Sequence, residues 1–181
     1  MSEGEQKCEE ISRQDGEGEG ENLTALARRM ARLYHYIART MKEELGRSET
    51  ERILTKSVWR YGESLGREAR EEAEARGLEP EMEYFDQVSD CPGIGCEKDV
   101  GGEIGAREGI VTSCPLADEW LKLGNDLARL YCLSQQAKYR AYNPKLQCEY
   151  LSNRLDGDGE CHLVVRLLKD ATEQPPTPVD N

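Results

Sequence analysis

The sequence predicts an α+β fold: an N-terminal helical hairpin plus a third helix, packed on a four-stranded, mostly antiparallel sheet. Three observations lead to it. The first half of the chain has apolar residues at helical spacing. The second half has short strand-like runs between glycine-rich turns. A Cys-Pro pair precedes a further helical pattern between them. With 181 residues, the chain can close one hydrophobic core, so we expect a single domain.

Two long helices should form the hairpin. The first, over 23–45, is expected to bury one apolar face: Leu23, Leu26, Met30, Leu33, Ile37, Met41 and Leu45. Gly46 should end it. Ser48 and Glu51 then form a capping-box pattern, and the second helix continues with its own apolar positions: Leu54, Val58, Tyr61, Leu65 and Ala69. Gly62 and Gly66 each lower helix stability by about 1 kcal/mol relative to alanine. Because this cost needs a reason, we expect a helix or a ligand to approach them too closely for a side chain to fit.

The rest of the domain should contain four strands and the third helix. Strand-like runs at 83–88 and 109–114 flank a long glycine-dense loop. The third helix should begin at Pro115 and end at the Tyr-Asn-Pro of 142–144. Two further strands, LQCEYLSNRL and ECHLVVRLL, are joined by the turn at 156–159, whose glycines permit positive φ. The last two strands therefore form a hairpin.

Composition sets the domain limits and excludes several functions. Residues 1–21 are acidic and 170–181 are Pro-rich and polar, so both should be disordered tails around a domain at 22–169. A net charge of -12 argues against nucleic acid and anionic membrane surfaces. No stretch approaches the roughly 20 apolar residues of a membrane span. Seven cysteines, an odd number, favour reduced thiols and a cytoplasmic location.

Cys114 is the first candidate for chemistry. It directly precedes Pro115 at the expected helix start, where free backbone N–H groups and the helix dipole stabilise a thiolate. A partly buried structural thiol is the alternative, because cysteines are often buried. Cys91 is also followed by a proline, but it lies in a loop. Cys114 is therefore the first expected nucleophile.

The final hairpin suggests a second group of site residues. A tight turn at Gly157-Asp158 places these pairs opposite each other on one face: Arg154 with Cys161, Ser152 with Leu163, Tyr150 with Val165 and Cys148 with Leu167. Such a mixed face is typical of a small-molecule pocket. Arg154 would favour a thiolate at Cys161 or hold a carboxylate ligand, unless it merely reaches solvent. Cys161 thus joins the catalytic candidates, and Arg154, Tyr150 and Ser152 the substrate-binding ones.

Metal and histidine chemistry have weaker support. The Cys-x4-Cys spacing of Cys91 and Cys96 has no second matching pair, so we expect no cofactor and keep zinc as a weak alternative. His162 alternates to the strand face opposite Cys161, so the two cannot form a dyad within the strand. Histidine as a residue type suits chemistry at neutral pH, but His35 is more simply a structural, partly exposed histidine. Turn formation is the expected role of Asp156 and Asp158.

Several segments, in order, resemble the L-2-amino-thiazoline-4-carboxylic acid hydrolase family: YGESLGREAR, CPLADEWLKLGNDLARLYC, YNP and LDGDGECHLVV. The resemblance covers most of 25–168. Five residues of these motifs complete the expected substrate-binding set: Tyr61, Gly62, Tyr142, Asn143 and Asp158. The resemblance implies a hydrolase that opens the thiazoline ring of a cyclic cysteine precursor and yields an N-carbamoyl cysteine.

The resemblance and the residues together give two functional expectations. The first is a hydrolase that opens a small cyclic C–N/C–S substrate through a cysteine thiolate, because a cyclic amidine carbon is electrophilic. The second is a non-enzymatic domain that binds a small ligand or senses thiol or metal state, since the fold is similar to vinyl-reductase-like domains. A small-molecule partner is expected in both cases. The glycine-bearing second helix is compatible with a homodimer.

Overall fold

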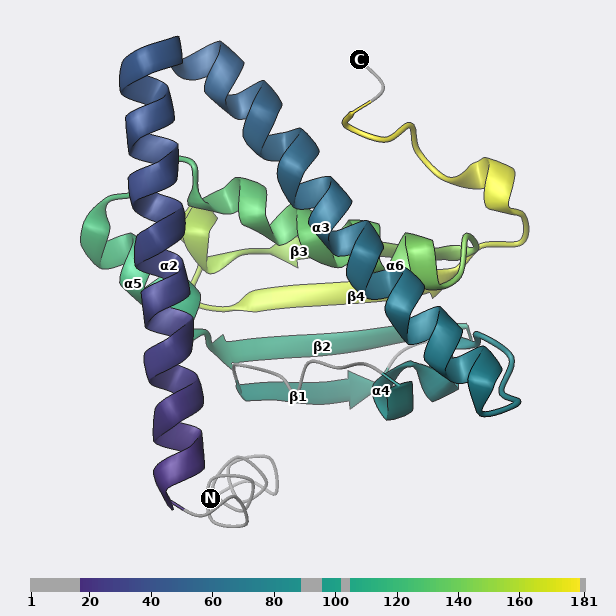
Figure 1. Cartoon of the computed structure of the whole chain (residues 1–181). Coiled ribbons are helices and arrows are strands. Elements are labelled where there is room, and N and C mark those ends of the chain that lie inside the picture. Colours follow the sequence, from purple (N-terminus) through teal and green to yellow (C-terminus); the bar gives the residue numbers. More distant parts are fainter. Residues whose placement is uncertain (1–16, 89–95, 102–104, 180–181) are drawn as a thin grey trace.

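The computed structural model describes residues 17–88, 96–101 and 105–179 (Figure 1), with side chains described from residue 22 and outside 96–101. The described ranges contain four helices of nine or more residues: α2 (Glu17–Leu45), α3 (Arg47–Ala75), α5 (Pro115–Leu123) and α6 (Leu133–Tyr142). Of these, α3 and α6 pack on one face of the sheet, and α2 packs on α5. The strands are β1 (Cys96–Gly101), β2 (Ala106–Ser113), β3 (Leu146–Ser152) and β4 (Cys161–Leu167). Their order is β1-β2-β4-β3, with every neighbouring pair antiparallel. The predicted α+β class is confirmed.

Two predicted elements differ from the observed ones. The run at 83–88, predicted to be a strand, forms the end of the 3-10 turn Met82–Tyr84 and the short helix α4 (Phe85–Val88). Phe85 and Val88 are buried by this helical arrangement, so the apolar run serves the core without pairing. The outer strand is instead β1, which lies within the glycine-dense segment expected to be a loop.

The predicted third helix is two helices. Gly124 ends α5 in the left-handed conformation, with φ 63, which non-glycine residues rarely adopt. The chain then turns at Asn125, whose side chain accepts a hydrogen bond from the Leu127 amide at 3.1 Å. A 3-10 segment, Ala128–Cys132, leads into α6. This break turns the chain so that Cys132 lies near the β4 end of the sheet.

The final hairpin is shifted by two residues from the predicted register. Tyr150 pairs with Leu163 and Cys148 with Val165, because a 3-10 turn (Arg154–Asp156) and an irregularity after Tyr150 lengthen the connection. Side chains alternate faces with a period of two, so a shift of two keeps the same residues on the helix-covered face. Leu163, Val165 and Cys148 accordingly join the main core between the sheet, α3, α4 and α6.

Helix α2 contacts the domain through a face that lies roughly 100° around the helix from the predicted one. Its buried side chains are the small ones, Ala27, Ala31 and Ala38. The Ala31 carbonyl accepts a hydrogen bond from Trp120 Nε1 at 2.8 Å, which brings α2 close to α5. The large apolar side chains predicted to be buried are largely exposed: Leu23, Leu26, Met30, Leu33, Ile37 and Leu45. Short alanines allow the two helices to approach closely, and the larger residues face away.

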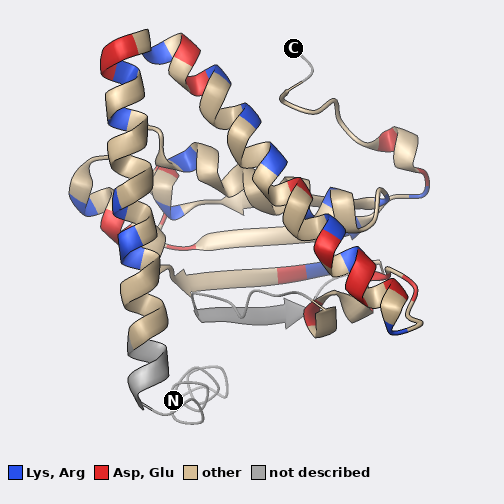
Figure 2. Cartoon of the chain, viewed as in Figure 1, with Lys and Arg blue, Asp and Glu red and all other residues tan. Residues whose placement is uncertain are grey.

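The space beside the two glycines of α3 is filled by another helix of the same chain. A Cβ on Gly62 would lie 2.3 Å from the Ser134 carbonyl oxygen, and one on Gly66 would lie 2.2 Å from that of Lys138. Both oxygens belong to α6, so α6 is the element that approaches these glycines closely. On its outer side α3 carries bands of opposite charge (Figure 2), including the i,i+4 pairs Arg70–Glu74 and Arg76–Glu72. The expected dimerisation surface at these glycines is therefore taken up by α6.

Helix α2 begins at Glu17, within the segment expected to be a tail. Near the other end, Gln174 donates hydrogen bonds to the carbonyls of Leu146 and Pro144, at 2.7 and 3.1 Å. In the described ranges, no helix is long and apolar enough to cross a membrane.

Candidate functional site

Three cysteines from separate elements meet where α5, η2 (Ala128–Cys132) and β4 converge, and we call Cys114, Cys132 and Cys161 the thiol cluster. Cys114 precedes α5, Cys132 ends η2 and Cys161 begins β4. A thiolate charge on Cys161 would raise the pKa of both other thiols, which shows that the three groups lie near one another. None of the four described cysteines, which also include Cys148, forms a disulfide. The two cysteines predicted to be catalytic are therefore brought together.

Cys114 occupies the N-cap of α5, in extended conformation with φ -140. Burial raises the pKa of its thiol, and this outweighs the opposite effect of the Ala117 and Leu116 backbone N–H groups. The helix terminus thus favours the thiolate as predicted, but desolvation prevails in the resting protein. The Cys114 side chain is partly accessible and packs against the α2–α5 core. Its thiol is consequently protonated at neutral pH.

The turn after β3 holds the other two thiols. Asn153, which is only 1% exposed, donates from Nδ2 to the Cys132 sulfur at 3.6 Å. The next residue, Arg154, donates its backbone N–H to the Cys161 sulfur at 3.4 Å. The turn itself is fixed by Asp158, whose carboxylate accepts the Asn153 N–H at 2.8 Å. Asp158 therefore shapes the site from behind, consistent with its expected turn-forming role.

The Arg154 side chain runs along the first turn of α5. Its Nη2 lies 2.8 Å from Oδ1 of Asp118. Nη1 of the same guanidinium is buried and has no hydrogen-bond partner among the described residues. Asp118 lies four residues after Cys114, and its N–H donates to the Cys114 carbonyl at 2.9 Å. Because residues four apart share a helix face, Arg154 is held about one turn from Cys114. It contacts Cys161 through its backbone and not, as predicted, through its side chain.

Two tyrosines form the aromatic border of the cluster. Burial raises the pKa of Tyr150 well above its ordinary value, and thiolate charge on the nearby cysteines would raise it further. The Arg129 guanidinium lies 4.9 Å from the Tyr150 ring centroid and is paired with Asp156 at 2.8 Å. Tyr34 from α2 donates to the Leu127 carbonyl at 3.2 Å, and burial raises its pKa as well. Neither phenol is ionised at neutral pH.

The other predicted substrate-binding residues lie elsewhere. Ser152 donates its hydroxyl to the Glu160 carbonyl at 3.0 Å and closes the hairpin. Tyr142 is fully buried at the far end of α6, about 15 Å along that helix from Cys132, and its hydroxyl donates to Glu81 O at 3.1 Å. Next to it, Asn143 donates to the Pro80 carbonyl at 2.8 Å. These two residues tie α6 to the segment after α3.

The predicted residues of α3 also face other neighbours. Gly62 is closed off by Ser134 and Ala137 of α6. Tyr61 is 42% exposed, and its ring centroid lies 6.3 Å from that of Tyr131. It borders the exposed side of the helical layer. The structure thus brings together Cys114, Cys161, Arg154 and Tyr150, with Asp158 in support.

The described residues form neither a metal centre nor a pairing of histidine with cysteine. Side chains in these ranges form no group of three or more His, Cys, Asp or Glu arranged to hold a metal ion. Cys91 and the side chain of Cys96 lie outside the described residues. His162 points to the other sheet face, as predicted, where its Nε2 lies 2.9 Å from Glu108 Oε2. The weak zinc alternative remains a prediction.

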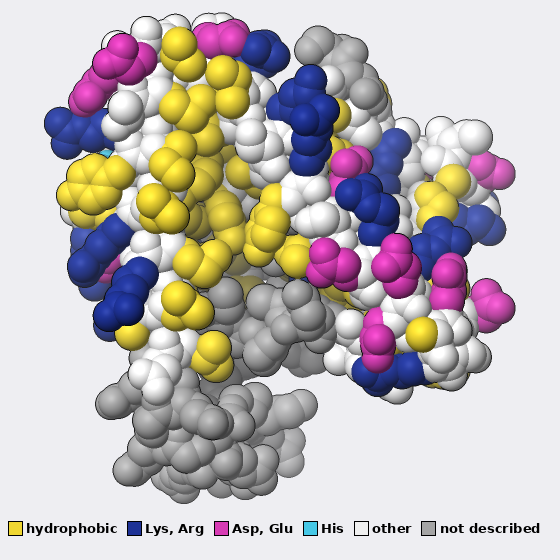
Figure 3. Space-filling view, viewed as in Figure 1, with side chains coloured by type: hydrophobic (Ala, Val, Ile, Leu, Met, Phe, Trp, Pro, Cys, Tyr) yellow, Lys and Arg dark blue, Asp and Glu magenta, His cyan; other side chains and the backbone are white. Residues whose placement is uncertain are grey.

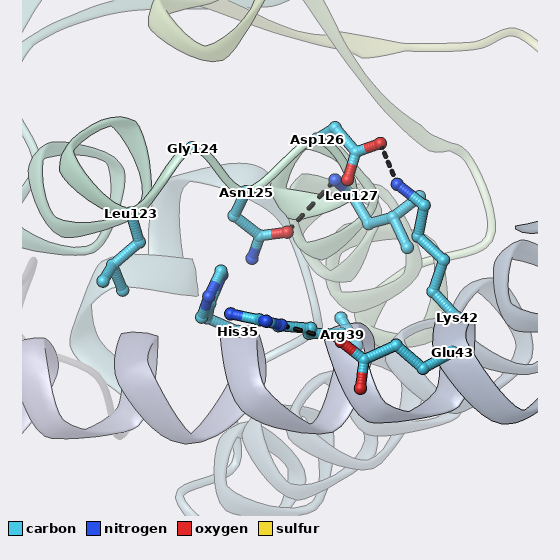
Figure 4. A pocket seen from close by; sticks show the side chains of 10 residues that line it. His35, Arg39, Lys42, Glu43, Leu123, Gly124, Asn125, Asp126 and Leu127 are labelled. Atoms are coloured by element: carbon cyan, nitrogen blue, oxygen red, sulfur yellow. Dashed lines mark hydrogen bonds and ion pairs between the residues drawn. The ribbon is translucent and has the colours of Figure 1, made fainter.

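A cavity of about 470 Å³, separate from the thiol cluster, lies between α2 and the loop 124–127 (Figure 4). Two polar atoms on its wall, His35 Nδ1 and Asn125 Nδ2, are buried and have no hydrogen-bond partner in the described part of the chain. Around them lie Arg39, which pairs with Glu43, and Lys42, which pairs with Asp126. The charges of this wall are therefore balanced, and the uncommitted groups are the neutral amide and the imidazole.

Sequence reasoning missed three contributors to the site. Asp118 could have been found, because it stands four residues after Cys114 on the same face of a predicted helix. Cys132 appeared only as one cysteine among seven, and the break at Gly124 that positions it was not predicted. Asn153 was read as part of a strand. Its role depends on the turn geometry that shifted the hairpin register.

Comparison with known proteins agrees with this architecture. A crystal structure of trafficking protein particle complex subunit 3 from Naegleria fowleri, covalently bound to palmitic acid, is similar with TM-score 0.52 and 16% identity, over 80% of this chain and 96% of that chain. The phenol-responsive sensory domain of the transcription activator PoxR, solved with phenol, is similar with TM-score 0.52 and 11% identity, over 81% and 82%. At these identities the likeness concerns the fold alone.

Sequence comparison is more specific. No curated protein matches the chain. The family model described as L-2-amino-thiazoline-4-carboxylic acid hydrolase matches residues 27–165, which include the whole thiol cluster and its supporting turn. The match spans most of the chain and confirms the resemblance seen in the Cys-Pro, Tyr-Asn-Pro and Gly-Asp-x-x-Cys motifs. This chain therefore belongs to the L-2-amino-thiazoline-4-carboxylic acid hydrolase family.

Proposed function

We propose that this protein is a hydrolase that opens a small cyclic amidine bearing a carboxylate, such as a 2-amino-thiazoline-4-carboxylate, with Cys114 as nucleophile. The observation that carries the proposal is the guanidinium of Arg154, which is fixed by Asp118 while its buried Nη1 remains uncommitted. A buried donor on a cation suits a carboxylate, because charge-assisted hydrogen bonds are the strong ones. Cys114 lies within about one helical turn of this anchor.

The protonated state of Cys114 is compatible with attack on an amidine. The ring nitrogen of a cyclic amidine is basic, so it can take the thiol proton as the sulfur adds to the carbon between the ring nitrogen and the ring sulfur. Breaking the bond from that carbon to the ring sulfur then opens the ring. The ring sulfur leaves with a proton, and an isothiourea remains attached to Cys114.

Water completes the reaction. It adds to the isothiourea carbon and expels the Cys114 thiol, which regains its proton. The added oxygen becomes the carbonyl of an N-carbamoyl group, so one substrate and one water give one N-carbamoyl cysteine. Cys161 and Cys132, the other two thiols of the cluster, are the groups that would lie nearest to this carbon if Cys114 attacks it. Cys161 receives the Arg154 N–H, which makes it the second candidate nucleophile.

The test is turnover of 2-amino-thiazoline-4-carboxylate by the purified full chain, followed by mass spectrometry of the product. We expect Cys114→Ala to lower kcat by at least about 10³-fold, the scale on which removal of a nucleophile is felt. Loss of the Arg154 contact in Arg154→Ala should raise KM by about 10- to 100-fold. Cys148→Ala, which removes a thiol from the other core cluster, is the matched control. Full turnover by both Cys114→Ala and Cys161→Ala would contradict the proposal.

A second candidate function is non-catalytic binding of a small ligand in the cavity beside α2. The supporting observation is the pair of uncommitted atoms, Asn125 Nδ2 and His35 Nδ1. A hydroxyl can accept from the amide and donate to a neutral imidazole nitrogen. Phenol is a suitable probe: it should raise the melting temperature of the wild type and leave that of Asn125→Ala unchanged. An unchanged wild-type melting temperature would contradict this role.

A further inference from the structure

Helix α2 leaves a long apolar surface uncovered. Seven of its large apolar side chains are 38–63% exposed: Leu23, Leu26, Met30, Leu33, Tyr36, Ile37 and Leu45. Tyr61 of α3 is also exposed, at 42%. Figure 3 shows these apolar side chains running along α2 and towards α3. Monomeric proteins rarely expose contiguous apolar patches of more than a few hundred Å². We call these α2 residues the α2 stripe.

The stripe is not a by-product of α2 packing on the domain. The helix already meets the domain through Ala27, Ala31 and Ala38, which are at most 1% exposed. A surface helix needs one apolar face, and the opposite face is normally polar. Here the larger side chains lie on the neighbouring face, roughly 100° around the helix from the alanines, and stay 38–63% exposed, so α2 has a second apolar contact to make. The spacing of Leu23, Leu26, Met30, Leu33 and Ile37 alternates between three and four, which is the seam of a helix that pairs with another helix.

The size of the stripe matches that of a subunit interface. Large apolar side chains that are about half exposed leave on the order of 100 Å² each, so the stripe offers roughly 700 Å². A standard stable interface buries about 800 Å² on each partner. With Tyr61 and the flanking aliphatic stems of charged residues, the available area reaches this value.

The arrangement of residues selects a second copy of the chain in antiparallel orientation. The stripe is approximately symmetric: antiparallel pairing that brings Met30 opposite Ile37 also places Leu23 within one residue of Leu45, and Leu33 lies beside its own copy.

We infer that the α2 stripe is the two-fold interface of a homodimer, with the two α2 helices antiparallel and Leu33 near the axis. A two-fold interface is isologous, so one self-complementary patch on each subunit is sufficient. The glycines of α3 take no part, since α6 covers them. The inference does not depend on the proposed hydrolase activity, because the thiol cluster lies where α5, η2 and β4 meet.

The mass of the full chain in solution is the first test. Light scattering after size exclusion should give twice the 20.5 kDa chain for the wild type. Leu33→Glu combined with Ile37→Glu should give a monomer with an unchanged circular dichroism spectrum, because both side chains are exposed in the subunit. The matched control is Leu151→Glu, which changes a 56% exposed leucine on β3 and should stay dimeric. A monomeric wild type, or a dimeric double variant, would overturn the inference.

Cysteine crosslinking tests the orientation. Under oxidation, Leu33→Cys should give a disulfide-linked dimer on a non-reducing gel beyond the wild-type background, whereas Leu23→Cys should not. Crosslinking of Leu23→Cys without Leu33→Cys would instead indicate parallel helices and overturn the assignment. A monomeric chain that binds phosphatidylcholine vesicles through the stripe, with binding lost in the double variant, would assign the surface to lipid and contradict the dimer.

Discussion

Arg154 and Asp118 join the hairpin turn to the first turn of α5 through an Nη2–Oδ1 contact of 2.8 Å. The exposed fraction is 20% for the arginine side chain and 34% for the aspartate, so the pair is partly shielded from solvent. This contact holds the guanidinium at the first turn of α5, about one helical turn from Cys114, while leaving its Nη1 uncommitted. The proposed carboxylate anchor and the proposed nucleophile are thereby joined, although they are far apart in the sequence.

Asp118 should act as a positioning residue. Asp118→Asn removes the charge that holds Arg154, so KM for the thiazoline carboxylate should rise by about 3- to 10-fold, as expected for a weakened charge-assisted contact. The kcat value should change little. Urea unfolding should show a loss of about 1 kcal/mol, in the range of partly exposed ion pairs. A fall in kcat without a change in KM would mean that Asp118 acts in the chemistry itself.

The thiol cluster should react slowly with alkylating agents at neutral pH. Burial raises the pKa of Cys114 and Cys132 above the ordinary value of 9.0, and only the thiolate is alkylated. The iodoacetamide rate at Cys114, followed by peptide mass spectrometry, should therefore keep rising beyond pH 9. A rate that levels off below pH 8 would show that the helix terminus outweighs desolvation.

The close contact of α3 with α6 predicts a strong effect of a single methyl group. Alanine normally stabilises a helix relative to glycine, but Gly62→Ala places its Cβ 2.3 Å from a backbone oxygen. The free energy of unfolding should fall by about 1–3 kcal/mol, as for other overpacked sites. Gly159→Ala, where a Cβ meets nothing within 4 Å, is the control and should have little effect. Equal stability of the two variants would contradict the close helix contact.

Acid should weaken the attachment of α2 to α5. The hydrogen bond from Arg32, at 2.5 Å, lowers the pKa of Glu119 below its ordinary value of 4.5. A lowered folded-state pKa contributes stability above the unfolded pKa, and this contribution is lost as the pH falls through the folded value. Melting temperature measured from pH 6 down to pH 3 should therefore fall less steeply for Glu119→Gln than for the wild type. Parallel profiles would show that the pair contributes nothing.

The sequence predicted where the helices lie better than it predicted which of their faces are buried and where they end. Periodicity placed the α2 pattern correctly, since the apolar spacing is helical. It assigned the wrong face to the domain, because alanines and leucines both count as apolar, and close packing on α5 selects the smaller side chains. The break after α5 depends on one left-handed glycine, Gly124, whose conformation an apolar pattern that continues past it does not reveal.

The site could be predicted only where local rules determine it. Cys114 followed from the Cys-Pro helix start, and Tyr150 from strand alternation. The partner of Arg154 could not be predicted, because it depends on a turn that shifts the hairpin by two residues and directs the side chain to α5. Tyr142 and Asn143 marked a real helix end. Their polar groups satisfy backbone carbonyls there, a role that motif resemblance does not distinguish from ligand binding.

We propose that Cys114 carries the covalent intermediate, and mass spectrometry can detect it. Full-length protein is mixed briefly with 2-amino-thiazoline-4-carboxylate, quenched with acid and mapped by peptide for added mass. We expect an adduct of one substrate mass on the peptide containing Cys114, absent from Cys114→Ala and retained in Cys148→Ala. Undiminished turnover by Cys114→Ala, with no adduct on any thiol of the cluster, would contradict it.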